Sequence, residues 1–348
     1  MSKLIKIKVK EVIQQTSEAV TIKFKKPFFK KIEYKPGQFL TVEVDLNGTK
    51  ERRAYSLSSA INIDSELQVT VKKVANGTVS KYMNNNVKAG DVLTVIPPLG
   101  KFVHEVNKKA KRNILLFGGG SGITPLMAML KSVLHFEKES KVALIYANKN
   151  TESIIFRKEL QELKQKFKER FTLVHVLKNN DGVTAQYTGR INHDIIKSVV
   201  DQMGERVGYN SLFYICGPFG FMDTVKASLF KQGISEDKIH TESFTAALEE
   251  FMPKNEVART IMVKLGKKWK ELQVQPKVNV LAAMIKSGMN VQYSCGTGIC
   301  GTCKCKLVEG EVDMSFNLGL TEDDKKNSLI LPCVSFPISD NVKIDFNK

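Results

Sequence analysis

The sequence lacks the long apolar runs of membrane proteins and secreted precursors. No window of its 348 residues approaches about 18 uninterrupted apolar side chains, so we expect no membrane span. The start, "MSKLIKIKVKEV", alternates lysine with isoleucine and leucine and has no continuous apolar core, so we expect no secretory signal. The expected location is the cytoplasm, where cysteines stay reduced and a cysteine cluster more often holds metal than disulfides.

The sequence also lacks internal repeats, low-complexity tracts and nucleic-acid-binding signatures. Its net charge is +17, distributed as +10 over residues 1–110, +4 over 111–255 and +3 over 256–348. The lysines are spread along alternating segments, without a helix-turn-helix or an RNA-binding motif. We therefore expect no nucleic-acid partner. An acidic protein partner or an anionic cofactor would use this charge better, and a solvated basic surface is the simpler alternative.

Three regions differ in hydrophobic pattern. Over residues 1–110, segments such as "VTIKF" and "LQVTV" alternate apolar and polar side chains between turn signals, which predicts a small antiparallel β-barrel. Residues 111–245 alternate continuous apolar runs, such as "NILLF" and "VALIY", with helical segments, which predicts a parallel sheet covered on both faces. A polar, Pro-containing linker is expected over 246–258, and short strands with one helix over 259–348.

Two glycine turns follow apolar runs of the second region. "FGGGSGITP" places Gly119 and Gly120 ahead of a helix that opens near Pro125, so backbone N–H groups and a helix N-terminus can approach a phosphate. No Gly-Lys-Ser/Thr follows, which excludes a Walker loop. "CGP" places Cys216 and Gly217 after another run, and open α/β sheets bind ligands at such carboxyl ends. Each turn alone is also compatible with a purely structural role.

The first region carries groups suited to a flavin nucleotide. "RRAYS" combines Arg53, which suits a diphosphate, with Tyr55, which can lie on a flat ring, and Ser56, which can hydrogen-bond a ring nitrogen. "NGTVSKYM" adds Gly77 and Ser80 as a second phosphate contact. An ordinary barrel strand with exposed arginines is the alternative.

Four of the six cysteines crowd into "YSCGTGICGTCKCK", residues 293–306. Cys295, Cys300 and Cys303 follow the spacing C-x4-C-x2-C, and Cys333 comes later, which is the plant-type spacing for a 2Fe-2S cluster. Zinc also suits four thiolates, but structural zinc sites usually take two close pairs. The interleaved glycines allow backbone N–H groups to turn towards bridging sulfides, which favours the cluster. Cys305 falls outside this pattern and is expected on a strand.

These motifs, in this order, resemble the ferredoxin-NADP reductase superfamily with a C-terminal plant-type ferredoxin domain. "PGQF", "RAYS", "GGGSGITP" and "CGP" are similar to its motifs, and the likeness covers nearly the whole chain. Within the superfamily the chain resembles the reductase subunits of phenylacetyl-CoA epoxygenase systems, down to the "CKCK" that includes Cys305. The resemblance implies an FAD-binding barrel, an NAD(P)-binding α/β domain, the linker and a β-grasp ferredoxin domain at 259–348. Gly296, where a basic residue is common, removes no ligand.

The resemblance also implies which residues bind FAD or the nicotinamide nucleotide: Arg53, Tyr55, Ser56, Gly77, Val79, Ser80, Gly119, Gly120, Thr124, Pro125, Cys216, Gly217 and Phe244. The implied cluster ligands are Cys295, Cys300, Cys303 and Cys333. Ser56 near the flavin N5, Cys216 beside the reactive nicotinamide carbon and Glu242 nearby would be the catalytic residues. Phe244 would cover the second flavin face, with an ordinary core position as the alternative.

Nicotinamide gives up two electrons as a hydride whereas the cluster accepts one at a time, so a flavin must mediate between them. We therefore expect an NAD(P)H-dependent FAD reductase that passes electrons through its cluster to another protein. By resemblance, that protein is the oxygenase component of a monooxygenase acting on phenylacetyl-CoA or another acyl-CoA. A desaturase, a hybrid-cluster protein or another ferredoxin-dependent enzyme is the alternative. A zinc-stabilised binding module, which would be colourless, is the alternative from a different class.

The coenzyme is suggested by two basic residues. Lys149 and Arg157 lie where they could meet a 2′-phosphate, which favours NADPH over NADH. FAD is favoured over FMN by "GTVS" and the family likeness. The oligomeric state and the final substrate leave no signal in these residues.

Overall fold

The computed structural model describes residues 4–25, 32–46, 48–75, 77–179, 185–203, 210–244, 253–314, 317 and 319–347. The chain divides into two compact units. The larger comprises Leu4–Glu51 and Tyr55–Phe244, and the smaller comprises Met1–Lys3, Arg52–Ala54 and Thr245–Lys348.

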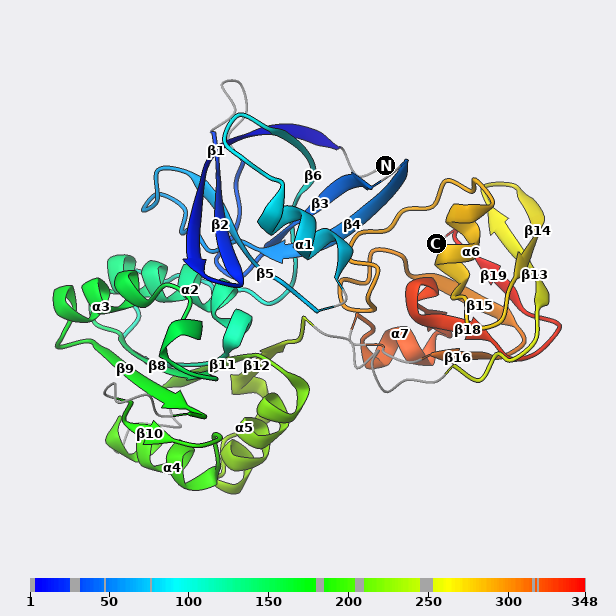
Figure 1. Ribbon diagram of the computed structural model, residues 1–348. Coiled ribbons are helices and arrows are strands. Elements are labelled where there is room, and N and C mark those ends of the chain that lie inside the picture. Colours follow the sequence, from blue (N-terminus) through cyan, green and yellow to red (C-terminus); the bar gives the residue numbers. More distant parts are fainter. Residues whose placement is uncertain are drawn as a thin grey trace. The chain divides into compact units, whose positions relative to one another are not determined.

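The first sheet has six strands in the order β4-β3-β6-β1-β2-β5 (Figure 1). Their bounds are β1 (Ile5–Thr16), β2 (Ala19–Phe24), β3 (Phe39–Leu46), β4 (Thr49–Ser56), β5 (Leu67–Lys72) and β6 (Val92–Leu99). An antiparallel bridge joins Leu57, which follows β4, to Val69 on β5, so the two ends of the sheet meet and close a barrel. The apolar side of each alternating strand fills its interior, where Ile22, Leu40 and Val95 are fully buried. Helix α1 (Thr78–Asn85) follows β5.

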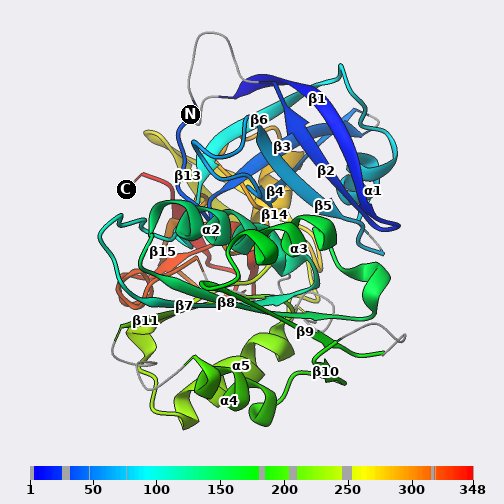
Figure 2. The same ribbon diagram turned by 90° about the vertical axis from the view of Figure 1, so that its left-hand side faces the viewer.

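The second sheet is parallel, with strand order β10-β9-β8-β7-β11-β12. Its strands are β7 (Asn113–Gly119), β8 (Lys141–Asn148), β9 (Phe171–Leu177), β10 (Tyr187–Thr188), β11 (Ser211–Cys216) and β12 (Ile239–Glu242). Helices α2 (Ile123–Phe136) and α3 (Arg157–Lys166) cover one face, and α4 (His193–Gln202) and α5 (Phe219–Lys231) cover the other (Figure 2). Leu116 packs into one core and Leu115 into the other, which explains the continuous apolar runs.

The smaller unit contains a five-stranded mixed sheet in the order β14-β13-β19-β15-β17. Its strands are β13 (Arg259–Leu265), β14 (Lys268–Val274), β15 (Cys305–Glu309), β17 (Leu329–Ile330) and β19 (Lys343–Asp345). A separate pair is formed by β16 (Val312–Met314) and β18 (Ser335–Pro337). Helix α6 (Val280–Lys286) buries Val280, Leu281 and Met284 in the same core as the sheet. Helix α7 (Glu322–Lys326) begins at a capping box between Thr321 and Asp324.

Four 3₁₀ turns complete the described elements: η1 (Gly120–Gly122), η2 (Thr151–Ser153), η3 (Glu236–Lys238) and η4 (Pro332–Val334). The predicted fold class, an antiparallel barrel followed by a parallel α/β sheet and a small C-terminal domain, is confirmed. The exact domain boundaries stay predictions. Of the expected linker, residues 246–252 lie outside the described residues, and 253–258 form neither helix nor strand. None of the helices in the described ranges has the length and apolar character needed to cross a membrane.

The core of the smaller unit allows a matched test of packing. Val263 on β13 is 0% exposed, whereas Val308 on β15 is 51% exposed. We expect Val263→Ala to lower the free energy of unfolding by about 2 kcal/mol or more, because it removes two buried methyl groups and leaves a cavity. Val308→Ala should change it by no more than about 0.5 kcal/mol. Urea unfolding followed by the fluorescence of Trp269, the only tryptophan of the chain, measures both. Equal losses in the two variants would contradict this core assignment.

Candidate functional site

Two glycine turns meet at the carboxyl edge of the parallel sheet. A Cβ added to Gly122 would lie 2.0 Å from the carbonyl oxygen of Cys216, and one added to Gly217 would lie 3.1 Å from the Cα of Gly119. The backbones therefore touch directly, and neither position has room for a side chain. Gly120 adopts a φ of +53°, and the space where its Cβ would lie is open within 4 Å. The edge is thus backbone packed on backbone, and Gly120 is the glycine of these turns at which a phosphate or a nicotinamide can approach the main chain closely.

Helix α2 begins directly behind the first turn. The buried Thr124 hydroxyl donates to the carbonyl of Ser121 at 3.1 Å, and Pro125 is buried within the first helical turn. The Tyr146 hydroxyl donates to the carbonyl of Gly120 at 3.0 Å. These side chains hold the shape of the turn. The groups left to meet an anion are the N–H groups of the turn and of the helix N-terminus.

The predicted catalytic residues come together at this edge. Cys216 ends β11 and pairs in register with Glu242, which ends β12. The Ser56 hydroxyl, at the end of barrel strand β4, hydrogen-bonds the Glu242 carboxyl group. All three side chains are at least nine-tenths buried, with Cys216 0%, Ser56 4% and Glu242 8% exposed. A residue of the barrel therefore contacts a residue of the nicotinamide-type edge.

The electrostatics of this group favour neutral side chains. Burial raises the pKa of Glu242 to about 8, and the Ser56 hydrogen bond offsets part of that rise. Burial, with a further contribution from Glu242, also raises the pKa of the Cys216 thiol. Within the described part of the chain, the buried Oε2 of Glu242 has no hydrogen-bond partner. A protonated carboxyl group with an unused oxygen suits a flavin or nicotinamide ring that offers its own polar atoms.

The remaining flavin-site residues lie on β4 and at the start of α1. Tyr55 is partly buried against the barrel core, and Arg53 is exposed on the same strand. The Ser80 hydroxyl accepts from the backbone N–H of Val74 at 3.1 Å and donates to the carbonyl of Gly77 at 3.3 Å. Val79 is 1% exposed in the barrel core. The side chains of Val79 and Ser80 are thus engaged within the protein itself. An FAD phosphate would therefore meet backbone N–H groups at the start of α1.

The two residues expected to choose the coenzyme are exposed beyond the sheet. Lys149 follows β8, and Arg157 opens α3. Burial, together with the charges of Lys164 and Arg157, lowers the pKa of His175 on β9 to about 4. The field at the ends of β8 and β9 is therefore positive, as an anionic ribose phosphate requires. Phe244 is partly buried against the core that contains α2.

The four predicted cluster ligands lie together in the smaller unit as two pairs. The Sγ atoms of Cys303 and Cys333 are 3.4 Å apart, and the thiols of Cys295 and Cys300 hydrogen-bond each other. Among the described residues, no group of three or more His, Cys, Asp or Glu side chains converges on a single ion position. A 2Fe-2S cluster distributes its ligands over two irons, so an arrangement in pairs fits it.

Backbone N–H groups surround these sulfurs. They donate to Cys333 from Gly298 at 3.2 Å and to Cys295 from Thr297 and Cys300 at 3.4 Å. The Cys300 thiol and the N–H groups of Thr297 and Cys300 lower the pKa of Cys295 to about 5. The N–H dipoles directed at Cys295 and Cys333 therefore favour negative charge on these two sulfurs, as thiolate ligands need.

Glycine backbone shapes this loop. Gly296 has a φ of +68°, Gly298 of +77° and Gly301 of +67°, a region that other residues rarely adopt. A Cβ on Gly301 would also lie 2.8 Å from the carbonyl oxygen of Gly319. Cys305, the first residue of β15, is 0% exposed in the core, where the expectation placed it on a strand.

Sequence reasoning anticipated backbone N–H groups turned towards sulfur but did not identify the donors, which are Thr297, Gly298 and Cys300. It also missed a buried polar cluster around His104 and Glu137, for which no motif exists because its members come from distant segments.

Three protein families match consecutive parts of the chain. They are the oxidoreductase FAD-binding domain over residues 5–104, the oxidoreductase NAD-binding domain over 116–227 and the 2Fe-2S iron-sulfur cluster binding domain over 263–337. The expected cofactors, FAD, a nicotinamide nucleotide and a 2Fe-2S cluster, are confirmed by these matches. The roles of individual residues stay predictions.

The chain also matches relatives over nearly their whole length. The chain is 33% identical to the ferredoxin reductase component of 3-ketosteroid-9-alpha-monooxygenase from Rhodococcus rhodochrous, covering 99% of this chain and 97% of that one. It is 30% identical to one of the subunits of 1,2-phenylacetyl-CoA epoxidase from Escherichia coli (strain K12), covering 97% and 96%. The solved structure of phthalate dioxygenase reductase matches with a TM-score of 0.71 at 24% identity, covering 99% and 98%, which shows the shared fold.

The raised pKa of Glu242 predicts a pH-dependent stability. Between its ordinary pKa of 4.5 and about 8, the folded chain keeps a proton that the unfolded chain releases. The free energy of unfolding should therefore fall as the pH rises through this window, by up to about 1.4 kcal/mol per pH unit from this group. Glu242→Gln is neutral at every pH and should remove this contribution.

Urea unfolding of wild type and variant, followed by circular dichroism at several values from about pH 5 to pH 8, measures the slope. Glu162→Gln, at an exposed carboxylate of α3, is the control and should keep the wild-type slope. Identical slopes in wild type and Glu242→Gln would show that Glu242 is ionised in the folded protein.

Proposed function

Because the chain belongs to the family of ferredoxin reductase components of multicomponent oxygenases, we propose that it takes electrons from NADPH and delivers them to an oxygenase. The electrons would leave through the 2Fe-2S cluster, which would be held by Cys295, Cys300, Cys303 and Cys333. The proposed substrate of that oxygenase is a coenzyme A thioester such as phenylacetyl-CoA. This choice is supported by the 30% identity to the epoxidase component over nearly the whole chain. When bound, FAD supplies the change from a hydride to single electrons.

One observation carries the proposal for the larger unit: Ser56 of the barrel hydrogen-bonds Glu242, which pairs with Cys216 at the edge of the parallel sheet. Both turns next to Cys216 are built on glycine, and the space where a Gly120 Cβ would lie is open. A flat ring on the barrel side and a second flat ring on the glycine side would thus meet at one buried place. Hydride transfer needs such direct approach, because the reacting atoms must come within about 3–3.5 Å.

The residues at this place would position the rings and exclude water. They would not act as nucleophiles. Cys216 stays a neutral thiol because its pKa is raised, so it offers bulk and low polarity beside the ring. Glu242 stays protonated at neutral pH. Its carboxyl group is bonded to the Ser56 hydroxyl, and its Oε2 would be left to meet the ligand. Burial of all three side chains leaves no room for competing solvent.

The cysteine loop has a different task, which is to hold negative charge. Its N–H donors lower the cost of placing several thiolates together, and backbone dipoles do so without adding a positive side chain. Lys304 next to the ligands is neutralised by Asp324, whose oxygens lie 2.9 and 3.0 Å from its ammonium group.

Removal of one cluster ligand tests the proposed route. Cys300→Ser should reduce electron delivery to the oxygenase component to background, while flavin reduction by NADPH survives, because Cys300 belongs to the other unit. Stopped-flow absorbance of the flavin and steady-state oxygenase turnover measure the two steps. The oxygenases offered should include one that acts on an acyl-CoA and one that acts on a steroid.

Cys305→Ala is the matched control, since Cys305 is buried in the core outside the ligand set. It should keep both the visible bands of the cluster and the delivery of electrons. Wild-type oxygenase turnover in Cys300→Ser would overturn the proposed route, and turnover with the steroid oxygenase alone would overturn the acyl-CoA assignment.

The proposed preference for NADPH is tested at the two exposed basic residues. We expect Lys149→Ala and Arg157→Ala each to raise the KM for NADPH about 5- to 10-fold, with little change for NADH, because each would lose a charge-assisted contact to the 2′-phosphate. Lys158→Ala, one residue along α3 and 92% exposed, is the control and should leave both KM values unchanged. Equal effects on NADH and NADPH would refute this assignment.

A further inference from the structure

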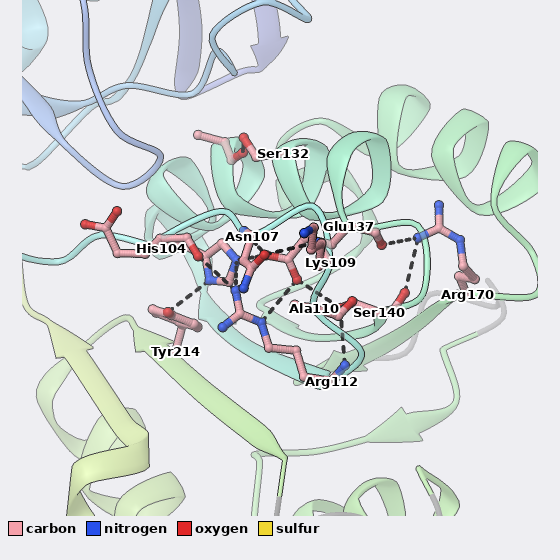
Figure 3. Close-up of polar contacts among 12 residues, drawn as sticks. His104, Asn107, Lys109, Ala110, Arg112, Ser132, Glu137, Ser140, Arg170 and Tyr214 are labelled. Atoms are coloured by element: carbon pink, nitrogen blue, oxygen red, sulfur yellow. Dashed lines mark hydrogen bonds and ion pairs between the residues drawn. The ribbon is translucent and has the colours of Figure 1, made fainter.

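A buried polar cluster lies where the connector between β6 and β7 meets α2 and β11 (Figure 3). His104 of the connector is 0% exposed. Its Nδ1 lies 3.0 Å from the Tyr214 hydroxyl, and its Nε2 lies 2.9 Å from Oε1 of Glu137, which is also 0% exposed. The imidazole therefore bridges β11 to Glu137, the residue that follows α2. No residue of this cluster belongs to the site described above.

The charge in the cluster is balanced by Arg112. Its guanidinium donates to Oε1 of Glu137 at 2.6 Å and to Oε2 at 3.1 Å, and Ser140 donates to Oε2 at 2.9 Å. Burial alone would raise the pKa of Glu137, but the bonds from His104 and Arg112 lower it to about 2. Glu137 is thus an ionised acceptor, and the buried pair with Arg112 leaves no net charge.

The imidazole of His104 has a hydrogen-bond partner at each ring nitrogen. An ionised Glu137 can only accept, so Nε2 of His104 carries a proton and donates to it. Nη2 of Arg112 also lies 3.1 Å from Nε2, but a protonated Nε2 cannot accept from the guanidinium. At Nδ1, either the ring nitrogen or the Tyr214 hydroxyl can donate, and both arrangements join β11 to the connector.

Tyr214 connects His104 to the strands that carry Cys216 and Glu242. Its ring stacks on His240 of β12, with centroids 4.8 Å apart and planes 21° apart, and Tyr214 and His240 pair in register. The next residues on the same faces of these strands are Cys216 and Glu242, one β repeat further on. The two strands are thus tied to the barrel side at two successive points, by His104 at Tyr214 and by Ser56 at Glu242.

We propose that His104 is a positioning residue for hydride transfer: from the connector it holds Tyr214, and through the β11–β12 pair it sets where Cys216 and Glu242 lie against Ser56. The proposal rests on the roles proposed for those three residues. A displacement of about 1 Å at a reacting centre can lower a rate about 100-fold. Loss of a hydrogen bond two residues away from Cys216 should therefore slow hydride transfer measurably.

Three variants separate positioning from stability. Tyr214→Phe keeps the stacked ring and removes only the hydroxyl. His104→Gln places an amide where Nε2 lies, so it keeps the bond to Glu137 and loses the partner of the Tyr214 hydroxyl. His104→Asn places its amide where Nδ1 lies, so it keeps a partner for that hydroxyl. Ser140→Ala is the control, because it removes the hydrogen bonds of the Ser140 hydroxyl to Glu137, the Ala110 carbonyl and the Arg112 N–H, and leaves the bond between His104 and Tyr214 in place.

The first measurement is the stopped-flow rate of flavin reduction at saturating NADPH. We expect Tyr214→Phe and His104→Gln to be slower by about 10-fold or more with nearly unchanged half-saturation, and His104→Asn to stay within about 3-fold of wild type. Ser140→Ala should keep the wild-type rate while lowering the melting temperature. If wild type itself does not reduce its flavin with NADPH or NADH, the proposed function fails, not only this inference.

The second measurement needs no coenzyme. Amide hydrogen exchange of the peptide that contains β11 should be faster in Tyr214→Phe and His104→Gln than in wild type or Ser140→Ala, because β11 has lost its hydrogen bond to the connector. The proposal is overturned if Tyr214→Phe keeps both the wild-type rate and exchange, or if His104→Asn is as slow as His104→Gln.

Discussion

The contact of backbone with backbone at the carboxyl edge of the parallel sheet is the constraint on which the larger unit depends. Gly122 lies so close to the Cys216 carbonyl that a methyl group would overlap it at 2.0 Å. This contact aligns the end of β7 with the end of β11, which are paired in register up to Gly118 and Cys216. A ligand at this edge therefore meets main-chain N–H groups whose positions are set by the sheet and by the Thr124 and Tyr146 hydroxyls bonded to the first turn.

Two buried glutamates of the same unit show how partners decide protonation. Glu137 has Arg112, His104, Ser140 and a backbone N–H around it, and its pKa falls to about 2. Glu242 has one hydroxyl partner, and its pKa rises to about 8. Burial acts in the same direction on both, so the number of donors accounts for the difference. The first is a buried charge held by its partners, and the second is a neutral acid whose Oε2 has no hydrogen-bond partner among the described residues.

The fold class was predictable because each region repeats a simple period: alternation in the barrel, continuous apolar runs in the parallel strands, and the spacing of the cysteines. The grouping of Ser56, Cys216 and Glu242 was suggested by motifs that the family resemblance supplied. The internal use of the Ser80 and Thr124 hydroxyls was not predictable, since a motif records a residue and not its hydrogen bond. The His104 cluster left no local signal, because its hydrogen bonds join residues 33 and 110 positions apart.

The two units have opposite electrostatic requirements: the cysteine loop must stabilise negative charge, whereas the edge of the parallel sheet keeps its side chains uncharged. At the cysteine loop, N–H groups aimed by glycines of positive φ stabilise negative charge on sulfur. At the edge of the parallel sheet, burial with few donors keeps Glu242 and Cys216 uncharged. Hydride transfer is favoured by a site without water and without charged side chains. A cluster needs the opposite, because its thiolate ligands stay negatively charged whether or not it has taken up an electron. One environment cannot provide both, and the chain provides each in a separate unit.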